Sequence, residues 1–159
     1  MKTQTLAHDN LNQLYKRVII QHARNPQNFG KLGKESILSE GINPLCGDKI
    51  KIYVNLNQNN VIQKICFEGT GCAISIASTS ILTSALEHQE SNKAIKCAEN
   101  LIRNLHNDSE LSINSIIDLD EIKALEGVKD FPSRIKCATL GWQTFLSSFN
   151  DNNIVTTTE

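Results

Sequence analysis

The pattern of apolar and polar positions is clearest over residues 50–68, where it repeats every second residue. Residues 50–57 alternate apolar with more polar side chains, which predicts a strand with one buried and one solvated face. Residues 58–60 read Gln-Asn-Asn and predict a turn. A second alternation follows over residues 61–68, and the short connection predicts an antiparallel hairpin. The positions expected to face inward are Ile50, Ile52, Val54 and Leu56 in the first strand and Val61, Gln63, Ile65 and Phe67 in the second.

Apolar residues recur every three or four positions in much of the remaining chain, which predicts helices. The first helix is expected to begin at a capping residue, Asp9 or Asn10, and to end before Pro26. A second runs from Cys72 to about Glu87, and its many alanine and serine residues would let it lie close to a sheet. Further elements are expected near Ser36–Glu40 (an edge strand), from Ser91 to about Leu105, over Asp118–Leu125, and from Phe131-Pro132-Ser133 to about Phe149 (helices).

The order of these elements predicts an α+β fold. A helix is followed by two or three antiparallel strands and then by several helices, which is typical of a small antiparallel sheet, here of about three strands, with helices packed on one face. The length of 159 residues suits one domain with its own core. We expect a flexible N-terminus over residues 1–9, a single domain over residues 10–149, and a disordered tail over residues 150–159.

Composition narrows the functional classes. The formal net charge is −1, which argues against a nucleic-acid partner, because such proteins carry a basic face. The apolar runs are only a few residues long, which argues against a membrane span, and no apolar segment follows Met1-Lys2-Thr3, which argues against a signal peptide. These features predict a cytoplasmic protein. In that compartment the five cysteines are expected to be free thiols or metal ligands.

Four residues are candidates for one metal site: Cys46, Asp48, Cys72 and Cys137. Cys46 and Asp48 flank Gly47, and a turn at this glycine would let both side chains reach the same point. Cys72 follows a glycine-rich break at a helix start, where the helix dipole favours a thiolate. Cys137 falls within the first two turns of the last helix. Three thiolates and one carboxylate would complete a four-coordinate zinc site.

The alternative for each of these cysteines is that it acts as a small buried hydrophobe. No CxxC pair is present, so spacing alone does not decide between the two interpretations. For Cys66, inside a strand, and Cys97, inside a helix, the structural interpretation is favoured. His22 is interpreted as a partly buried residue at a helix end, with a role beside the metal or a partner as the alternative. The aspartate is a harder ligand than sulfur, which suggests a site where one ligand is exchanged.

Four stretches of the sequence, taken together, resemble a known family. The stretches are Tyr15 with His22-Ala23-Arg24-Asn25-Pro26 and Gly30; Asn43-Pro44-Leu45-Cys46-Gly47-Asp48; Phe67-Glu68-Gly69-Thr70-Gly71-Cys72-Ala73-Ile74-Ser75; and Arg134-Ile135-Lys136-Cys137-Ala138-Thr139-Leu140-Gly141-Trp142. They resemble the NifU N-terminal/IscU-like family of iron–sulfur cluster assembly proteins, and its SufU type most closely. The resemblance covers about residues 10–149.

The resemblance implies a zinc-dependent sulfurtransferase in iron–sulfur cluster biogenesis. Cys46, Asp48, Cys72 and Cys137 would be the zinc ligands, and Cys46 would accept persulfide sulfur from a cysteine desulfurase of the SufS type. In SufU-type proteins the desulfurase is thought to displace this cysteine from zinc with its own histidine. The sulfur would then pass to a downstream cluster-assembly scaffold. Iron, or a transient iron–sulfur cluster on the same ligands, is the alternative to zinc.

A scaffold that assembles and transfers a cluster is the alternative function. Lys136 stands where IscU-type proteins carry histidine, and residues 107–127 look like the extra segment of SufU-type proteins. The Leu-Pro-Pro-Val-Lys motif of IscU-type proteins is also missing. These differences favour sulfur transfer. A zinc hydrolase or deaminase is disfavoured because the sequence has no HExxH or H-x-E motif, and a purely structural zinc ion is a further alternative.

Overall fold

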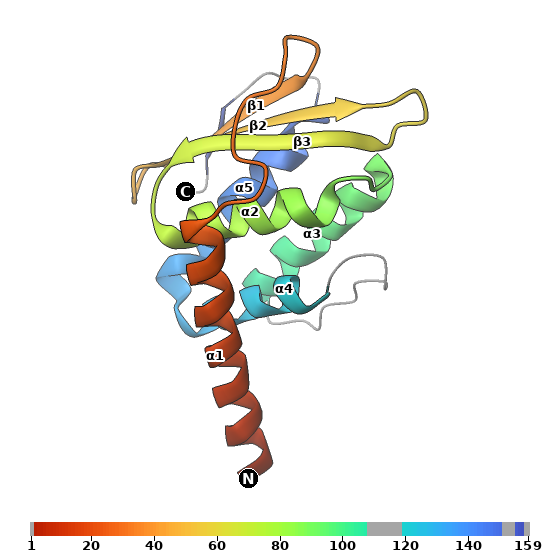
Figure 1. Ribbon diagram of the computed structural model, residues 1–159. Coiled ribbons are helices and arrows are strands. Elements are labelled where there is room, and N and C mark those ends of the chain that lie inside the picture. The colour runs from red at the N-terminus through yellow and green to blue at the C-terminus, as the bar shows by residue number, and fades with distance from the viewer. Residues whose placement is uncertain (1, 108–118, 151–154, 158–159) are drawn as a thin grey trace.

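The computed structural model describes residues 2–107, 119–150 and 155–157. Its elements, in chain order, are α1 (Lys2–Arg24), β1 (Ile37–Asn43), β2 (Asp48–Leu56), β3 (Ile62–Thr70), α2 (Ala73–Leu86), α3 (Ser91–Asn107), α4 (Leu119–Ala124), the 3-10 helices η1 (Leu125–Asp130) and η2 (Pro132–Arg134), α5 (Ile135–Ser147) and β4 (Thr156–Thr157). The predicted α+β class is confirmed, with helices on one side of a sheet (Figure 1).

The sheet has the strand order β3-β2-β1-β4, and the predicted hairpin is its centre. β2 pairs with β3 in antiparallel register, with Ile52 opposite Phe67 and Val54 opposite Ile65. β1 pairs with the other edge of β2, so that Ile37 lies opposite Val54 and Asn43 lies opposite Asp48. β4 adds a short parallel pairing to β1. The sheet is therefore mixed and has four strands, whereas the sequence predicts about three antiparallel ones.

β1 extends three residues beyond the edge strand expected near Ser36–Glu40. The prediction was too short because the inward positions of this strand are small or polar. Ser39 donates to the backbone oxygen of Thr144 at 3.0 Å, and a Cβ at Gly41 would collide with the side chain of Thr144. α5 therefore lies directly against this strand. A hydrophobic pattern cannot reveal a strand whose buried face has so few apolar side chains.

The small residues of α2 allow close packing, as predicted. The Ser78 hydroxyl donates to the backbone oxygen of Ala138 at 2.6 Å and accepts from the Trp142 ring at 2.9 Å. Gly141 faces Thr79, and a Cβ at Gly141 would lie only 2.3 Å from the Thr79 hydroxyl oxygen. The contacts of α2 with β3 and of α5 with β1 and β2 place both helices between the sheet and the remaining helices (Figure 1).

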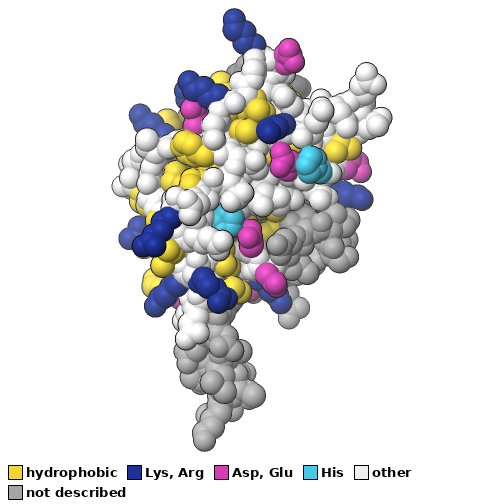
Figure 2. Space-filling view, viewed as in Figure 1, with side chains coloured by type: hydrophobic (Ala, Val, Ile, Leu, Met, Phe, Trp, Pro, Cys, Tyr) yellow, Lys and Arg dark blue, Asp and Glu magenta, His cyan; other side chains and the backbone are white. Residues whose placement is uncertain are grey.

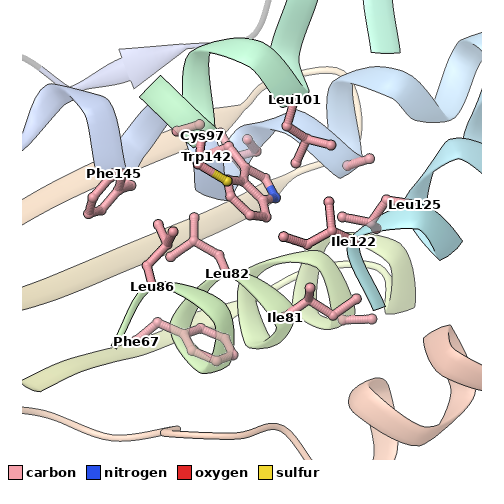
Figure 3. Close-up of a cluster of buried hydrophobic side chains, with 14 of the residues drawn as sticks. Phe67, Ile81, Leu82, Leu86, Cys97, Leu101, Ile122, Leu125, Trp142 and Phe145 are labelled. Carbon is pink, nitrogen blue, oxygen red and sulfur yellow. The ribbon is translucent and has the colours of Figure 1, made fainter. Parts of the chain in front are cut away.

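The hydrophobic core lies between these layers. Trp142 is fully buried, and Figure 3 shows its ring among Leu101, Ile122 and Leu82, which come from three other helices. Phe67 carries the contact to the sheet and is also fully buried. The large apolar side chains that α2 and α5 contribute to the core, from Ile81 and Leu140 onward, lie beyond the first turn of each helix, so the first residues of both helices are left for other contacts.

Two element boundaries near the ends of the chain differ from those predicted. α1 begins at Lys2 instead of Asp9 or Asn10, because residues 2–10 contain no proline or glycine to stop a helix. Within the tail expected over residues 150–159, Thr156–Thr157 form β4. Of the extra segment predicted over residues 107–127, residues 108–118 lie outside the described residues, and residues 119–127 form α4 and the start of η1. No helix in the described residues is long and apolar enough to cross a membrane.

Candidate metal centre

The loop between β1 and β2 carries Cys46 at one end of the sheet. Asn43 and Asp48 form the last cross-strand pair, and residues 44–47 connect them. The Gly47 N–H donates to the backbone oxygen of Asn43 at 2.8 Å, and Gly47 has a φ of +72°, a conformation that glycine adopts without strain. The predicted turn at this glycine is confirmed. Cys46 and Asp48 flank this glycine, and the turn leaves Cys46 exposed and Asp48 buried.

Asp48 faces the start of α2. It has no exposed surface, and its Oδ1 accepts a hydrogen bond from the Cys72 backbone N–H at 2.8 Å. The Cys72 thiol lies 3.9 Å from the other carboxylate oxygen. Gly71 makes this approach possible, because a Cβ there would lie 2.5 Å from Oδ1 of Asp48. The glycine-rich break before Cys72 therefore leaves room for the Asp48 carboxylate as well as ending the strand.

Cys72 and Cys137 both lie at helix starts, as predicted. Cys72 is the N-cap of α2, and its sulfur accepts from the Ser75 N–H at 3.4 Å. Cys137 is the third residue of α5 and is fully buried. Both sulfurs lie at the positive end of a helix dipole, which stabilises negative charge.

Cys46 and Cys137 meet across the site. Their sulfurs are 3.6 Å apart, and the Cys137 thiol donates to Cys46. The ligand atoms of Cys46, Asp48 and Cys137 all lie within 4.8 Å of one another. Cys72 stands beside this group of three, in contact with Asp48, and is not part of the mutual set. The structure therefore brings three predicted ligands together and places the fourth next to them.

The donor set fits zinc. A tetrahedral zinc ion with Zn–S bonds of about 2.3 Å separates its sulfurs by roughly 3.8 Å, close to the 3.6 Å between Cys46 and Cys137. Asp48 is a buried carboxylate, and in the described part of the chain no salt bridge reaches it. A buried carboxylate needs a cationic partner. A dication among these side chains would supply one.

Burial shapes the chemistry of the cysteines. It raises the pKa of the Cys137 thiol, and the hydrogen bond with Cys46 and the neighbouring Cys72 and Asp48 raise it further. A bound metal ion reverses this preference, because it holds a coordinating thiol deprotonated. Burial also raises the pKa of Cys66, and that of Cys97 to about 11. Cys66 pairs across strands with Tyr53, and Cys97 belongs to the core, so both fit the structural interpretation.

His22 lies apart from the four candidate ligands. It is buried, with Ser80 2.7 Å from its Nδ1 and Glu121 3.1 Å from its Nε2. The Gln27 N–H also donates to the Ser80 hydroxyl at 2.7 Å, so Ser80 links His22 to the segment that follows α1. The predicted place at a helix end is confirmed, but the residue is more deeply buried than expected, because it joins α1 to α2 and α4.

Sequence reasoning missed the surroundings of the ligands. Asn43 is fully buried, and its Nδ2 donates to the Cys137 sulfur at 3.7 Å. Its inward position follows from its pairing with Asp48, a register that the sequence alone did not supply. A hollow of about 360 Å³ adjoins Cys72 on the outside and is lined by Tyr15, Cys72, Ala73, Ile74, Phe131 and Arg134.

The rim of the site is apolar and exposed. Leu45, next to Cys46, is 76% exposed, and Phe131, at the hollow, is 47% exposed. Arg134 adds a positive charge there. In Figure 2, hydrophobic side chains also reach the surface along the left side of the molecule, among Lys and Arg side chains. Exposed apolar side chains of this kind are typical of surfaces that contact another protein.

The chain is similar in sequence to one family of known proteins. Residues 14–138 match the model of the NifU-like N terminal domain. The "Zinc-dependent sulfurtransferase SufU" of Bacillus subtilis is 40% identical over 134 residues, which cover 84% of this chain and 88% of the relative. The "Iron-sulfur cluster assembly scaffold protein IscU" of Streptococcus pyogenes is 35% identical, with 86% and 83% covered.

Solved structures show the same fold. The crystal structure of a protein from Fervidobacterium islandicum AW-1, described as a candidate iron–sulfur cluster assembly scaffold protein for the SUF system, is similar with a TM-score of 0.71. It is 28% identical in sequence, and the similarity covers 84% of this chain and 94% of that one. A nitrogen-fixing NifU-like protein from Brucella abortus, N-terminal part, has a TM-score of 0.75 at 18% identity and supports the fold alone.

Proposed function

Because the chain belongs to the family of NifU-like N-terminal domains, we propose that it acts in iron–sulfur cluster biogenesis as a zinc-dependent sulfurtransferase. The relative from Bacillus subtilis carries this activity in its name and covers most of the chain. The donor set of Cys46, Asp48 and Cys137 supports the same conclusion, since it suits a thiophilic dication.

Zinc would be held by Cys46, Asp48, Cys72 and Cys137. When bound, the ion keeps the cysteine sulfurs deprotonated at neutral pH, which supplies the nucleophile that sulfur transfer needs. Cys72 has to approach the other three, and it lies at the N-cap of α2, where the side chain is half-buried and not enclosed by a helix turn. Its contact with Asp48 supports this assignment.

One observation carries the function: of the three sulfurs near Asp48, only that of Cys46 belongs to an exposed residue in a loop. Cys137 is buried in α5, and Cys72 is half-buried at the start of α2. A sulfur acceptor must reach a partner's active site, and the exposed loop next to Leu45 allows that. We therefore assign Cys46 as the acceptor and the other three residues as the retained ligands.

The transfer step balances without any further reactant. The Cys46 thiolate attacks the terminal sulfur of a persulfide on the partner's cysteine. The new S–S bond forms on Cys46, and the partner's S–S bond breaks, with its electron pair leaving on the partner's cysteine as a thiolate. The proton stays on the terminal sulfur, so Cys46 becomes the persulfide. The same exchange then passes the sulfur to the thiolate of a downstream scaffold.

The partner that supplies such a sulfur is a cysteine desulfurase, which we take to be of the SufS type. The apolar rim at Leu45 and Phe131 supports docking of a protein at this end of the molecule. All five cysteines are free thiols. Free thiols fit a reducing compartment, and we place the reaction in the cytoplasm.

The experiment that tests this function is mass spectrometry after incubation with a cysteine desulfurase and cysteine. We expect a mass increase of one sulfur atom, localised to Cys46 by peptide analysis. Cys46→Ala should lose the adduct and should no longer stimulate the desulfurase. Cys66→Ala is the matched control, because this cysteine lies on β3 outside the site and should leave the adduct intact. A Cys46→Ala protein that stimulated the desulfurase normally would refute the assignment.

The second candidate function is assembly of a cluster on the same ligands, which the name of the Streptococcus pyogenes relative favours. Anaerobic reconstitution with iron and sulfide separates the two functions. A cluster that forms on the protein and moves intact to an apo-protein would favour the scaffold. Lys136, half-buried beside Cys137 and in place of a histidine ligand, supports sulfur transfer instead.

A further inference from the structure

We propose that Asn43 is a positioning residue that keeps Cys137 on the metal and thereby leaves Cys46 as the only sulfur acceptor. This inference rests on the proposed function and goes beyond it. The residue is not a metal ligand. It acts through hydrogen bonds to one of the two adjacent thiolates and to the loop that carries the other.

For Cys46 alone to accept sulfur, the incoming persulfide has to react with its sulfur and not with that of Cys137. Cys46 and Cys137 have the same chemistry, and their sulfurs are only 3.6 Å apart. A persulfide brought to one of them is within reach of the other. Burial distinguishes the two residues, since Cys46 is exposed and Cys137 is buried, but it does not change the short distance between their sulfurs. A contact that lowers the nucleophilicity of Cys137 alone would complete the distinction.

Asn43 makes that contact. Its Nδ2 donates to the Cys137 sulfur at 3.7 Å, with both residues fully buried. An N–H···S hydrogen bond stabilises negative charge on the sulfur, so the thiolate becomes a weaker nucleophile and a ligand that is held in a fixed orientation. In the described part of the chain, the hydrogen bond that Cys46 receives comes from the Cys137 thiol. That bond disappears when both cysteines are thiolates.

The orientation of the Asn43 amide follows from its other contact. Its Oδ1 accepts from the Leu45 N–H at 3.3 Å. A backbone N–H can pair only with the oxygen of a carboxamide, so the nitrogen must point toward Cys137. The backbone oxygen of Asn43 accepts from the Gly47 N–H as well. One residue therefore holds both ends of the Cys46 loop and the sulfur of Cys137.

The register of the sheet explains why an asparagine can do this. Asn43 and Asp48 are cross-strand partners with side chains on the same inward face. Asp48 contacts Cys72 at the start of α2, and Asn43 contacts Cys137 at the start of α5. An aspartate at position 43 would have nearly the same shape, but it would place an acceptor against the sulfur and lose the donor.

The test uses the full chain loaded with Co²⁺ and compares Asn43→Asp and Asn43→Ala with the unchanged protein. Loss of the N–H donor raises the energy of the sulfur electrons, so the sulfur-to-cobalt charge-transfer band should move to longer wavelength, further in the aspartate variant than in the alanine variant. Zinc affinity in a chelator competition should fall about tenfold, as for other residues that orient a metal ligand. After incubation with a desulfurase and cysteine, sulfur should appear on Cys137 as well as Cys46.

Ser39→Ala is the matched control. It removes a side chain from the same inward face of β1, where Ser39 contacts Thr144 and Ser148 and no cysteine. Its cobalt spectrum and sulfur location should be unchanged, and circular dichroism should show that all variants fold. Asn43→Asp keeps the acceptor for the Leu45 N–H, and the Gly47 N–H bonds the backbone oxygen, so the loop retains both hydrogen bonds.

The outcomes separate this inference from the proposed function. If both Asn43 variants fold, bind Co²⁺ with an unshifted band and carry sulfur on Cys46 alone, Asn43 has no positioning role. If the unchanged protein neither binds zinc nor accepts sulfur, the proposed function itself fails. A band shift in the variants together with sulfur on Cys137 would support the role, whereas a shift seen equally in Ser39→Ala would overturn it.

Discussion

The inward face of one sheet carries two kinds of surface. In the middle of β2, Ile50, Ile52 and Val54 are buried and pack against helices. At the start of the same strand, Asp48 and its cross-strand partner Asn43 are buried to the same degree but are polar. The side chains in the middle of β2 and at its start are equally buried, so burial alone does not explain why one set is apolar and the other polar. What differs is the neighbour: core side chains in the middle, cysteines at the end.

The middle of β2 contributes to the stability of the fold, whereas the Asp48 end is expected to contribute to function. Apolar burial contributes about 25 cal/mol per Å², so the middle of the sheet stabilises the fold. A buried carboxylate without a cation costs stability. The proposed metal ion would account for the buried carboxylate of Asp48. Changes in the middle should alter unfolding, whereas changes at the end should alter metal affinity and leave the apo-protein almost unaffected.

The largest effect is expected in the middle, for Trp142→Ala. The ring is fully buried among residues of three helices (Figure 3), and its N–H donates to Ser78. Its loss leaves a cavity, and the free energy of unfolding should fall by about 3–5 kcal/mol in a urea titration. Ile20→Ala, at a position that is 51% exposed, is the control and should change it by less than about 0.5 kcal/mol. A tryptophan variant as stable as the control would show that the core lies elsewhere.

Removal of zinc should have an intermediate effect on stability. At a free zinc concentration 100-fold above the dissociation constant, binding stabilises the folded state by about 2.7 kcal/mol. A chelator should therefore lower the midpoint of thermal unfolding by roughly 5–10 °C. Asp48→Ala, which lacks a ligand from the buried end, should respond much less to the chelator. Equal shifts in the two proteins would indicate that this aspartate does not hold the metal.

The smallest effect on the stability of the fold is expected for Gly71→Ala, which lies next to Asp48. The new methyl group would lie 2.5 Å from Oδ1 of Asp48, so the carboxylate has to move. We expect zinc affinity to fall about tenfold in a chelator competition, with little change in the unfolding of the apo-protein. Gly33→Ala is a matched control, because a Cβ there meets nothing within 4 Å. Unchanged zinc affinity at position 71 would mean that this contact is not needed.

The sequence predicted the regular part of the sheet well. Alternation over residues 50–57 and 61–68 marks strands, and both appear as β2 and β3. The inward face predicted for the second strand was only partly right: Ile65 and Phe67 are buried as expected, but Ile62 is buried and Gln63 is exposed. The pairing of the two strands shifts register between Asn55 and Leu56.

β1 was only partly predicted, because its inward residues Ser39, Gly41 and Asn43 carry no apolar signal. β4 was missed for a similar reason, since it has two threonines and pairs with a strand more than a hundred residues away.

The candidate site was predicted residue by residue, but its internal differences were not. Local features identified Cys46, Cys72 and Cys137, each at a loop or helix start, and the structure places them around Asp48. The exposure of Cys46 and the contact of Asn43 with Cys137 depend on the pairing of β1 with β2. Such a register joins residues through space, and no periodicity along the chain specifies it.

The close packing of α2 against α5 also fixes the backbone positions of two of the proposed metal ligands. Gly141 lies against Thr79, so the spacing of the two helices is fixed by the core. Cys72 and Cys137 start these helices, so the same packing sets how far apart the backbones of these two residues lie. Cys46 lies in a loop and is not bound by that packing. If these residues hold a metal ion as proposed, a cation larger than zinc would be accommodated mainly by movement of the Cys46 loop.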